Sequence, residues 1–278
     1  MGRASQTSPS APTGARKLFG LVFLGFFLIF GAWAFAAPYD APADEVQHSI
    51  RAVGVVSGQV LVKPTEIKWG KDNDGAGGIQ RVPEGLFHPA RCWGFDKTKP
   101  ATCQQPLSGG KLIDAPTSAG RYNPTYYAAV GLPLKLWPGW GGLVLSRLLS
   151  AAISAALLAW AFLVLIRWSR YGLMLAALVA SVTPMTSHLV GAINPNGLEI
   201  VAGIAFFCGA IPLLLGQPRG NARQLILLAG TGAVILAPLR ALGPLWLGCG
   251  LFALLVPQSR ARLKELWHNR LQDRKSVV

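Results

Sequence analysis

The sequence predicts an all-α multi-pass membrane protein, with about six transmembrane helices and a large exported loop after the first helix. Three observations predict this fold class. Hydrophobic residues make up 51% of the 278 residues and charged residues only 14%, whereas a soluble domain carries about a quarter. Long apolar runs alternate with short basic segments. Most of the acidic residues gather in one polar stretch, residues 38–141.

The basic residues are distributed as in a membrane protein and not as on a nucleic-acid-binding surface. The net charge is +14, but residues 38–141 hold 9 of the 12 acids and 11 of the 26 bases. The other bases lie almost wholly in the tails and short connections, which is the positive-inside pattern. We therefore expect a plasma-membrane protein in contact with the lipid bilayer, with both termini cytoplasmic and no nucleic-acid partner.

The first segment, residues 1–17, is rich in Ser, Pro, Ala and Gly and is expected to be a disordered cytoplasmic tail. Arg16 and Lys17 precede residues 18–37, an apolar run long enough to span a bilayer. A cleavable signal peptide is the alternative, because Ala34-Phe35-Ala36 resembles the small-residue cleavage site of such peptides. The length of the run and the spans that follow favour a retained first helix.

The predicted membrane domain covers residues 18–257, and its exported loop covers residues 38–141. The loop is dense in Gly and Pro and has few apolar runs, so we expect short elements and not a separate large domain. Residues 44–57 predict a short helix along the membrane, with Val46, Ile50 and Val53 on one face.

The four cysteines divide into two pairs. Cys92 and Cys103 lie in the polar segment and would face an oxidising space, so we expect a disulfide between them. Neither has a CxxC partner or a nearby histidine pair, which argues against zinc. Cys208 and Cys249 lie in apolar runs and are expected to be buried.

Five further apolar runs complete the predicted membrane domain, at residues 142–166, 171–190, 197–215, 225–239 and 242–256. The last two are short for two crossings, so one kinked or re-entrant segment is the alternative. Residues 258–278 form a basic tail, expected in the cytoplasm.

A first group of polar residues follows the first span, at the water interface of this topology. Asp44, Glu45 and His48 offer a base, a metal ligand and a proton carrier within reach of one another. The alternative interpretation is a solvated helix start, where carboxylates are favoured by the helix dipole.

Further polar residues are predicted to meet this group on the outer face. Asn194 suits a helix N-cap, and Glu199 lies just inside a span, where an ionisable group usually faces a cavity. Arg240 has a planar fork that suits a phosphate, with snorkelling to the interface as the alternative. We count Asn194, Asn196, Glu199, Arg240, Arg147 and His48 as candidate substrate-binding residues.

Five segments together resemble a known family. They are PYDAPADEVQH at residues 38–48, CWGF at 92–95 with Cys103, YNPTYY at 122–127, NPNGLE at 194–199 and RALGPLW at 240–246. As an ordered set over residues 18–257, they resemble the actinobacterial form of the predicted membrane proteins with domain of unknown function 2142 (DUF2142).

The resemblance implies a likeness to the GT-C glycosyltransferases, which use polyprenyl-phosphate sugars on the outer membrane face. In that class an acid in the first exported loop acts as base or metal ligand, and Asp44 is the matching position, with Glu45 beside it. Family members are usually longer, with more spans after the sixth. We therefore expect this sequence to be an N-terminal portion, with the missing C-terminal half among its expected partners.

Two functional hypotheses follow. In the first, the protein transfers a sugar from a polyprenyl-phosphate donor to a cell-envelope acceptor, with Asp44 as base. The leaving phosphate would be stabilised by Arg240, by Arg147, or by a divalent cation (Mg²⁺ or Mn²⁺) on Asp44 and Glu45. In the second, the protein is a non-catalytic transporter, flippase or assembly partner for envelope precursors.

Overall fold

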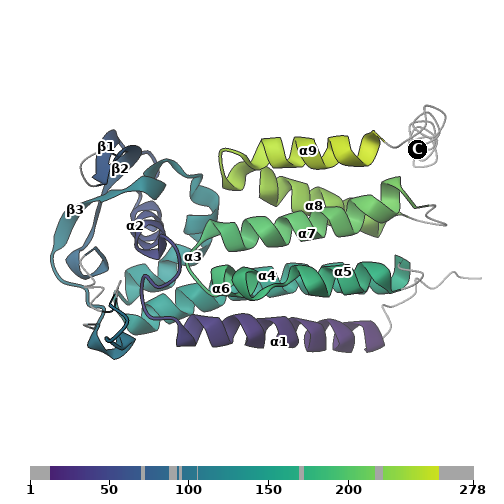
Figure 1. The fold of residues 1–278 in the computed structure, drawn as a ribbon, viewed down its shortest axis with the longest axis horizontal. Helices are drawn as coiled ribbons and strands as arrows, with labels where there is room; N and C mark the ends of the chain where they lie inside the picture. The colour runs from purple at the N-terminus through teal and green to yellow at the C-terminus, as the bar shows by residue number, and fades with distance from the viewer. Residues whose placement is uncertain are drawn as a thin grey trace, which may run out of the picture.

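The computed structural model describes residues 13–69, 73–87, 93, 96–104, 106–168, 172–216 and 222–256. A bundle of apolar helices carries a layer of shorter elements across one end (Figure 1). We call this layer, residues 38–139, the cap. Most of the predicted N-terminal tail, the whole of the predicted C-terminal tail and Cys92 lie outside the described residues.

Three helices are long and apolar enough to cross a membrane: α1 (Thr13–Ala36), α4 (Trp140–Trp168) and α7 (Pro195–Leu214). Helices α5 (Leu173–Ser181) and α6 (Pro184–Val190) make a fourth candidate if they form one span, and they are bent by 61° at the break. Pro184 explains the break, because it lacks the N–H that would continue α5. Thr183 then caps α6 by accepting from the Thr186 backbone N–H at 3.2 Å.

The predicted count of six crossings is not confirmed. The expected fifth and sixth spans are α8 (Arg223–Leu239) and α9 (Gly243–Leu255), with 17 and 13 residues. At about 1.5 Å per residue they cover about 26 and 20 Å, less than a hydrocarbon core of about 30 Å. They lie side by side and are joined by a short turn at Arg240, at the end of the bundle that carries the cap (Figure 1).

The cap contains a sheet, so the all-α prediction is wrong in this part of the chain. Strands β1 (Pro64–Trp69), β2 (Asn73–Pro83) and β3 (Leu112–Thr117) pair antiparallel in the order β1-β2-β3. The central strand begins with a glycine-rich run and has few β-branched or aromatic residues, so its sequence carries a weak strand signal. Short 3₁₀ turns complete the cap: η1 (Glu84–Leu86), η2 (Ala101–Cys103) and η3 (Ser118–Arg121).

The helix predicted at residues 44–57 is α2 (Glu45–Val56), and it packs beside α3 (Pro124–Leu136). Helix α2 is seen end-on in Figure 1, so it runs across the end of the bundle. Its apolar residues Val46, Ile50 and Val53 are buried in a cluster that also contains residues of β2, α3, α4 and α7. The apolar face is therefore covered by protein.

The cysteines follow the prediction only in part. Cys208 is free and buried, as expected, whereas Cys249 is free and exposed on α9. Cys103 ends η2, and because Cys92 lies outside the described residues, their pairing stays a prediction.

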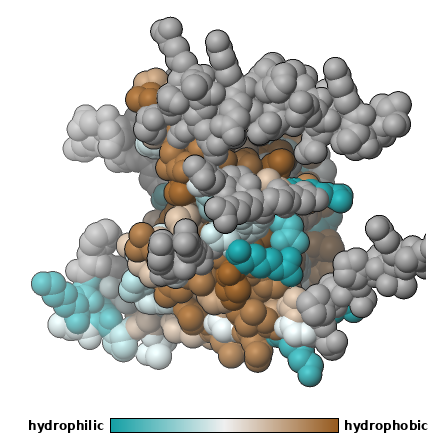
Figure 2. Space-filling model, turned by 90° about the vertical axis from the view of Figure 1, so that its right-hand side faces the viewer, coloured by the Kyte–Doolittle hydropathy of each residue, from teal (hydrophilic) through white to brown (hydrophobic). Residues whose placement is uncertain are grey.

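A second apolar core joins the spans themselves, with Phe30 of α1, Leu158 of α4 and Val201 of α7 among its buried residues. Seen from the end opposite the cap, the described surface is mostly hydrophobic with a few hydrophilic residues (Figure 2). Apolar side chains therefore lie both inside the bundle and on its surface, as in a membrane protein.

Helices α7 and α8 approach closely at small residues, and this packing gives a testable prediction. A Cβ added to Gly232 would lie 2.6 Å from the Phe206 backbone nitrogen, whereas one added to Gly230 of the same helix meets no atom within 4 Å. We expect Gly232→Leu to destabilise the protein by about 1–3 kcal/mol through overpacking. Gly230→Leu is the matched control, and thermal unfolding in detergent is the measurement. Equal melting temperatures for the two variants would contradict the close packing.

Candidate functional site

The chain turns sharply between α1 and α2. Two aspartates in this turn have left-handed backbone conformations, Asp40 with φ 63° and Asp44 with φ 58°. The Asp40 carboxylate accepts a hydrogen bond from the Val46 backbone N–H at 3.2 Å, while Asp44 makes no side-chain cap. Asp40, which the sequence analysis did not single out, therefore caps α2.

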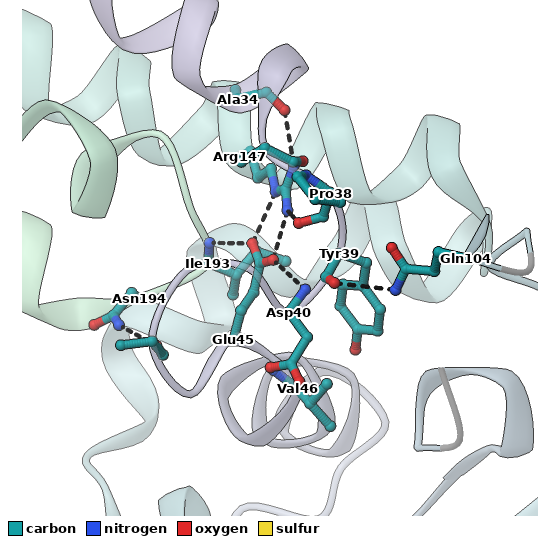
Figure 3. A network of polar contacts seen from close by, with 12 residues as sticks. Ala34, Pro38, Tyr39, Asp40, Glu45, Val46, Gln104, Arg147, Ile193 and Asn194 are labelled. Atoms are coloured by element: carbon teal, nitrogen blue, oxygen red, sulfur yellow. Dashed lines mark hydrogen bonds and ion pairs between the residues drawn. The ribbon is translucent and has the colours of Figure 1, made fainter. Parts of the chain in front are cut away.

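Arg147 is fully buried on α4, and its five N–H donors reach five acceptors (Figure 3). Its Nε donates to Glu45 Oε1 at 2.8 Å, and its Nη2 donates to Glu45 Oε2 at 2.5 Å. The remaining donors reach the carbonyl oxygens of Ala34, Ala37 and Pro38 at 2.8, 2.7 and 3.2 Å. Arg147 thus holds together the end of α1, the turn after it and the start of α2.

The hydrogen-bonding capacity of the Glu45 carboxylate is also fully used. Besides the two bonds from Arg147, its carboxylate accepts from the Ile193 backbone N–H at 3.1 Å and from the Asp40 backbone N–H at 3.2 Å. A carboxylate offers about four lone-pair sites, and these four bonds use them. The pair therefore also fixes the connection between α6 and α7 (Figure 3).

These contacts correct two expectations. Four hydrogen bonds occupy both oxygens of Glu45, so the carboxylate is not free to contact a substrate or to bind a metal. Arg147 has no donor left for a leaving phosphate. The described ranges also contain no group of three or more His, Cys, Asp or Glu side chains that could hold a metal ion. We therefore assign no divalent cation to Asp44 and Glu45.

Asp44 has the opposite environment. Its side chain is exposed and makes no hydrogen bond or ion pair with the part of the chain that the structure describes. The residue before it is anchored, because the Ala43 carbonyl accepts from Asn194 Nδ2 at 2.9 Å. A non-glycine residue in the left-handed region is strained by about 1–3 kcal/mol, and such residues cluster at functional sites.

Asn194 is the N-cap of α7, as predicted, and Pro195 lies in the first turn of the helix. Asn194 Oδ1 accepts from the Asn196 backbone N–H at 2.9 Å, and its Nδ2 is bonded to Ala43. Its own backbone N–H donates to the Tyr126 hydroxyl at 3.0 Å. The Asn194 side chain therefore holds the backbone at Ala43 and Asn196 in place, and it is not free to bind a substrate.

Arg240 lies between α8 and α9 and is held from three directions. Its Nη1 donates to Asn196 Oδ1 at 2.7 Å and lies 3.5 Å from Glu199 Oε2, and its Nη2 donates to the Tyr122 hydroxyl at 3.3 Å. The guanidinium also lies over the Tyr122 ring, 5.6 Å from its centre. The Arg240 side chain is still 36% exposed, so this fixed cation can reach solvent.

His48 lies behind this group. Its Nδ1 is 2.8 Å from the Tyr127 hydroxyl, and its ring centre is 5.6 Å from that of Tyr122. Burial, helped by the positive charge of Arg240, lowers the pKa of His48 to about 3. The histidine is therefore neutral near pH 7, which does not suit the expected proton carrier.

The three parts of the chain that carry the predicted site residues thus meet: the turn with Asp44, the start of α7 and the turn at Arg240. Hydrogen bonds from Asn194 to Ala43 and from Arg240 to Asn196 link them. The hydroxyls of Tyr122, Tyr126 and Tyr127 were not predicted as part of the site, and their segment entered only as one of the five that carry the family resemblance. The Asn123-Pro124 pair was a usable signal, because Asn before Pro is typical of a helix start. It places Tyr126 and Tyr127 in the first turn of α3, where both are buried.

The chain belongs to the family of predicted membrane proteins DUF2142, whose model matches residues 27–272. This confirms the resemblance drawn from the five segments, and the match includes every candidate residue at the site. No curated protein and no solved structure matches the chain. The family description gives a membrane protein and no activity, so the likeness to GT-C enzymes is carried forward only as a proposal.

The Glu45–Arg147 pair gives a prediction about stability. Removing one partner of a buried pair leaves the other charge unpaired, so Arg147→Met and Glu45→Leu should each cost about 3–5 kcal/mol. The double variant should recover only part of this, because the carbonyls of Ala34, Ala37 and Pro38 lose their donors at about 1–3 kcal/mol each. Unfolding in detergent measures all three. A double variant as stable as wild type would show that the carbonyl bonds contribute nothing.

The buried His48 gives a prediction about pH. Its pKa is lowered from 6.5 to about 3, so between these values the unfolded chain binds a proton that the folded chain does not. The stabilisation from neutral His48 is therefore complete above pH 6.5 and falls by about 1.4 kcal/mol per unit as pH decreases toward 3. His48→Gln, which is neutral throughout, should lose less stability across this range. Melting temperatures that fall in parallel for both proteins would contradict the assignment.

Proposed function

We propose that this membrane protein is a glycosyltransferase that moves a sugar from a polyprenyl-phosphate donor to a cell-envelope acceptor, with the cap on the exported side. The observation that carries the proposal is the exposed carboxylate of Asp44 on an anchored turn, where it has no partner among the described residues. It lies at the same end of the bundle as the positioned cation Arg240. A base and a phosphate-binding cation are the two groups that such a transfer needs.

In the proposed reaction, the Asp44 carboxylate takes the proton of the acceptor hydroxyl. The acceptor oxygen forms a bond to the anomeric carbon of the donor sugar, while the bond from that carbon to the phosphate oxygen breaks. The electron pair of this bond leaves with the polyprenyl phosphate. The protonated Asp44 then returns its proton to water, so charge and atoms balance.

Arg240 is proposed to contact the leaving phosphate. Among the described residues, its partners occupy Nη1 and one side of Nη2, so Nε and part of Nη2 stay available to a ligand. Glu199 and Asn196 hold the guanidinium in place, so the cation needs little reorganisation when negative charge develops. His48, neutral and behind Tyr122, supports the ring on which Arg240 lies.

A transporter or flippase of envelope precursors is the second candidate, and one observation favours it. Helices α5 and α6 are bent by 61° at their break, so the two together form either a broken span or a re-entrant loop. Discontinuous transmembrane helices are typical of transporters, where the break lies near the substrate. In that function Asp44 would have no chemical step to perform.

Asp44→Asn separates the two candidates. Asparagine keeps the size and tolerates the left-handed backbone but removes the basic carboxylate, so transfer should fall by about a hundredfold or more. Asp114→Asn, at another exposed acid of the cap, is the matched control and should retain activity. The assay supplies labelled polyprenyl-phosphate sugars to membranes and follows the label into envelope glycan. If the Asp44 variant transfers sugar as fast as wild type, Asp44 is not the catalytic base. If no form of the protein transfers sugar, the transporter function is favoured.

A further inference from the structure

The charge of Arg240 is balanced by Glu199 before any ligand binds. Glu199 Oε2 lies 3.5 Å from Arg240 Nη1, and the Glu199 side chain is only 14% exposed. Both partners of Nη1 come from the first two turns of α7, because Asn196 Oδ1 accepts from the same nitrogen at 2.7 Å. The cation and the carboxylate therefore face a ligand as one neutral pair.

A second arginine contacts the same tyrosine but cannot add its charge to a ligand site. Arg51 Nη2 donates to the Tyr122 carbonyl at 2.8 Å, whereas Arg240 Nη2 donates to the Tyr122 hydroxyl at 3.3 Å. Arg51 is 2% exposed, and its Nη groups also donate to two other backbone carbonyls. His48, whose ring lies beside Tyr122, is neutral near pH 7. Of these three basic side chains, only Arg240 can contact a ligand in solvent.

The phosphate changes its charge in the proposed reaction. In the donor it is a phosphodiester with a single negative charge. Breaking the bond from the anomeric carbon to the phosphate oxygen leaves a phosphomonoester, which carries nearly two negative charges above its second pKa of about 6. The added charge is repelled by the Glu199 carboxylate, and neither Arg51 nor His48 can offset it.

We propose that Glu199 makes this site selective for a singly charged phosphodiester over a doubly charged phosphomonoester, so that it weakens binding of the lipid product. The inference rests on the proposed function, which places the donor phosphate at Arg240. It adds the charge class of the ligand and a physical cause for product release. Glu199 acts through its charge and through Arg240, so it determines specificity and is not a catalytic residue.

Three substitutions isolate the charge of Glu199. Glu199→Gln keeps the side-chain length and an oxygen that can accept from Arg240 Nη1, but it removes the negative charge. Glu199→Asp keeps the charge and is the conservative variant. Glu84→Gln removes the charge of another half-buried acid, in η1 of the cap, and is the matched control. Arg240→Gln shows in addition whether a phosphate binds at the proposed cation.

The probes are geranyl phosphate, a monoester, and methyl geranyl phosphate, a diester of the same chain. Their binding to the full chain in nanodiscs at pH 8 is measured by titration calorimetry, with the heat of empty nanodiscs subtracted. A unit charge acting over about 7 Å in water changes binding by about threefold. We therefore expect Glu199→Gln to shift the ratio of the two dissociation constants at least about threefold in favour of the monoester. Glu199→Asp and Glu84→Gln should keep the wild-type ratio.

An unchanged ratio in Glu199→Gln, or an equal shift in Glu199→Asp or Glu84→Gln, would overturn the proposal. Undiminished binding of both probes by Arg240→Gln would also overturn it, because the phosphate would then lie elsewhere. The measurement requires no sugar transfer. A shifted ratio in a protein that transfers no sugar would therefore contradict the transferase alone, whereas sugar transfer with an unchanged ratio would contradict the assignment of Glu199 alone.

Discussion

The buried ion pair of Glu45 and Arg147 is the interaction on which the cap end of this structure depends. Two charges with no exposed surface are costly to desolvate, and such a pair is retained only if the remaining donors and acceptors are satisfied. Here the guanidinium makes five hydrogen bonds and the carboxylate four. These bonds come from the end of α1, the turn before α2, α4 and the connection before α7, so one pair sets the positions of all four.

This arrangement explains why residues of similar chemistry have different environments. Glu45 is enclosed, whereas Asp44, one residue earlier, is exposed on the turn that Glu45 fixes. The same contrast separates Arg147, which has no donor left, from Arg240, which is held at one edge and partly exposed. A site needs groups that are fixed but still accessible. Glu45 fixes the turn that carries Asp44, and Asn196, Glu199 and Tyr122 hold Arg240.

The long apolar runs were sufficient to predict α1, α4 and α7, because a span needs little more than length and hydropathy. The Asn194-Pro195 cap was also predictable, since its signal is local. The sheet was missed because β2 is rich in glycine. The predicted six crossings are not confirmed because α8 and α9, with 17 and 13 residues, are shorter than the other spans. The saturation of Glu45 could not be predicted, since its partners are up to 148 residues apart in sequence and include backbone groups that leave no pattern.

The most direct test of this account is hydrogen exchange of the backbone amides that Glu45 holds, measured for wild type and Glu45→Gln in a bilayer. Glutamine has one acceptor oxygen in place of two, and its amide donors would face the donors of Arg147 and Ile193. We expect peptides covering residues 37–46 and 191–196 to lose protection together, while the interior of α7 stays protected. Loss confined to the first turn of α2, or no loss at all, would contradict the conclusion that this pair organises the cap end of the protein.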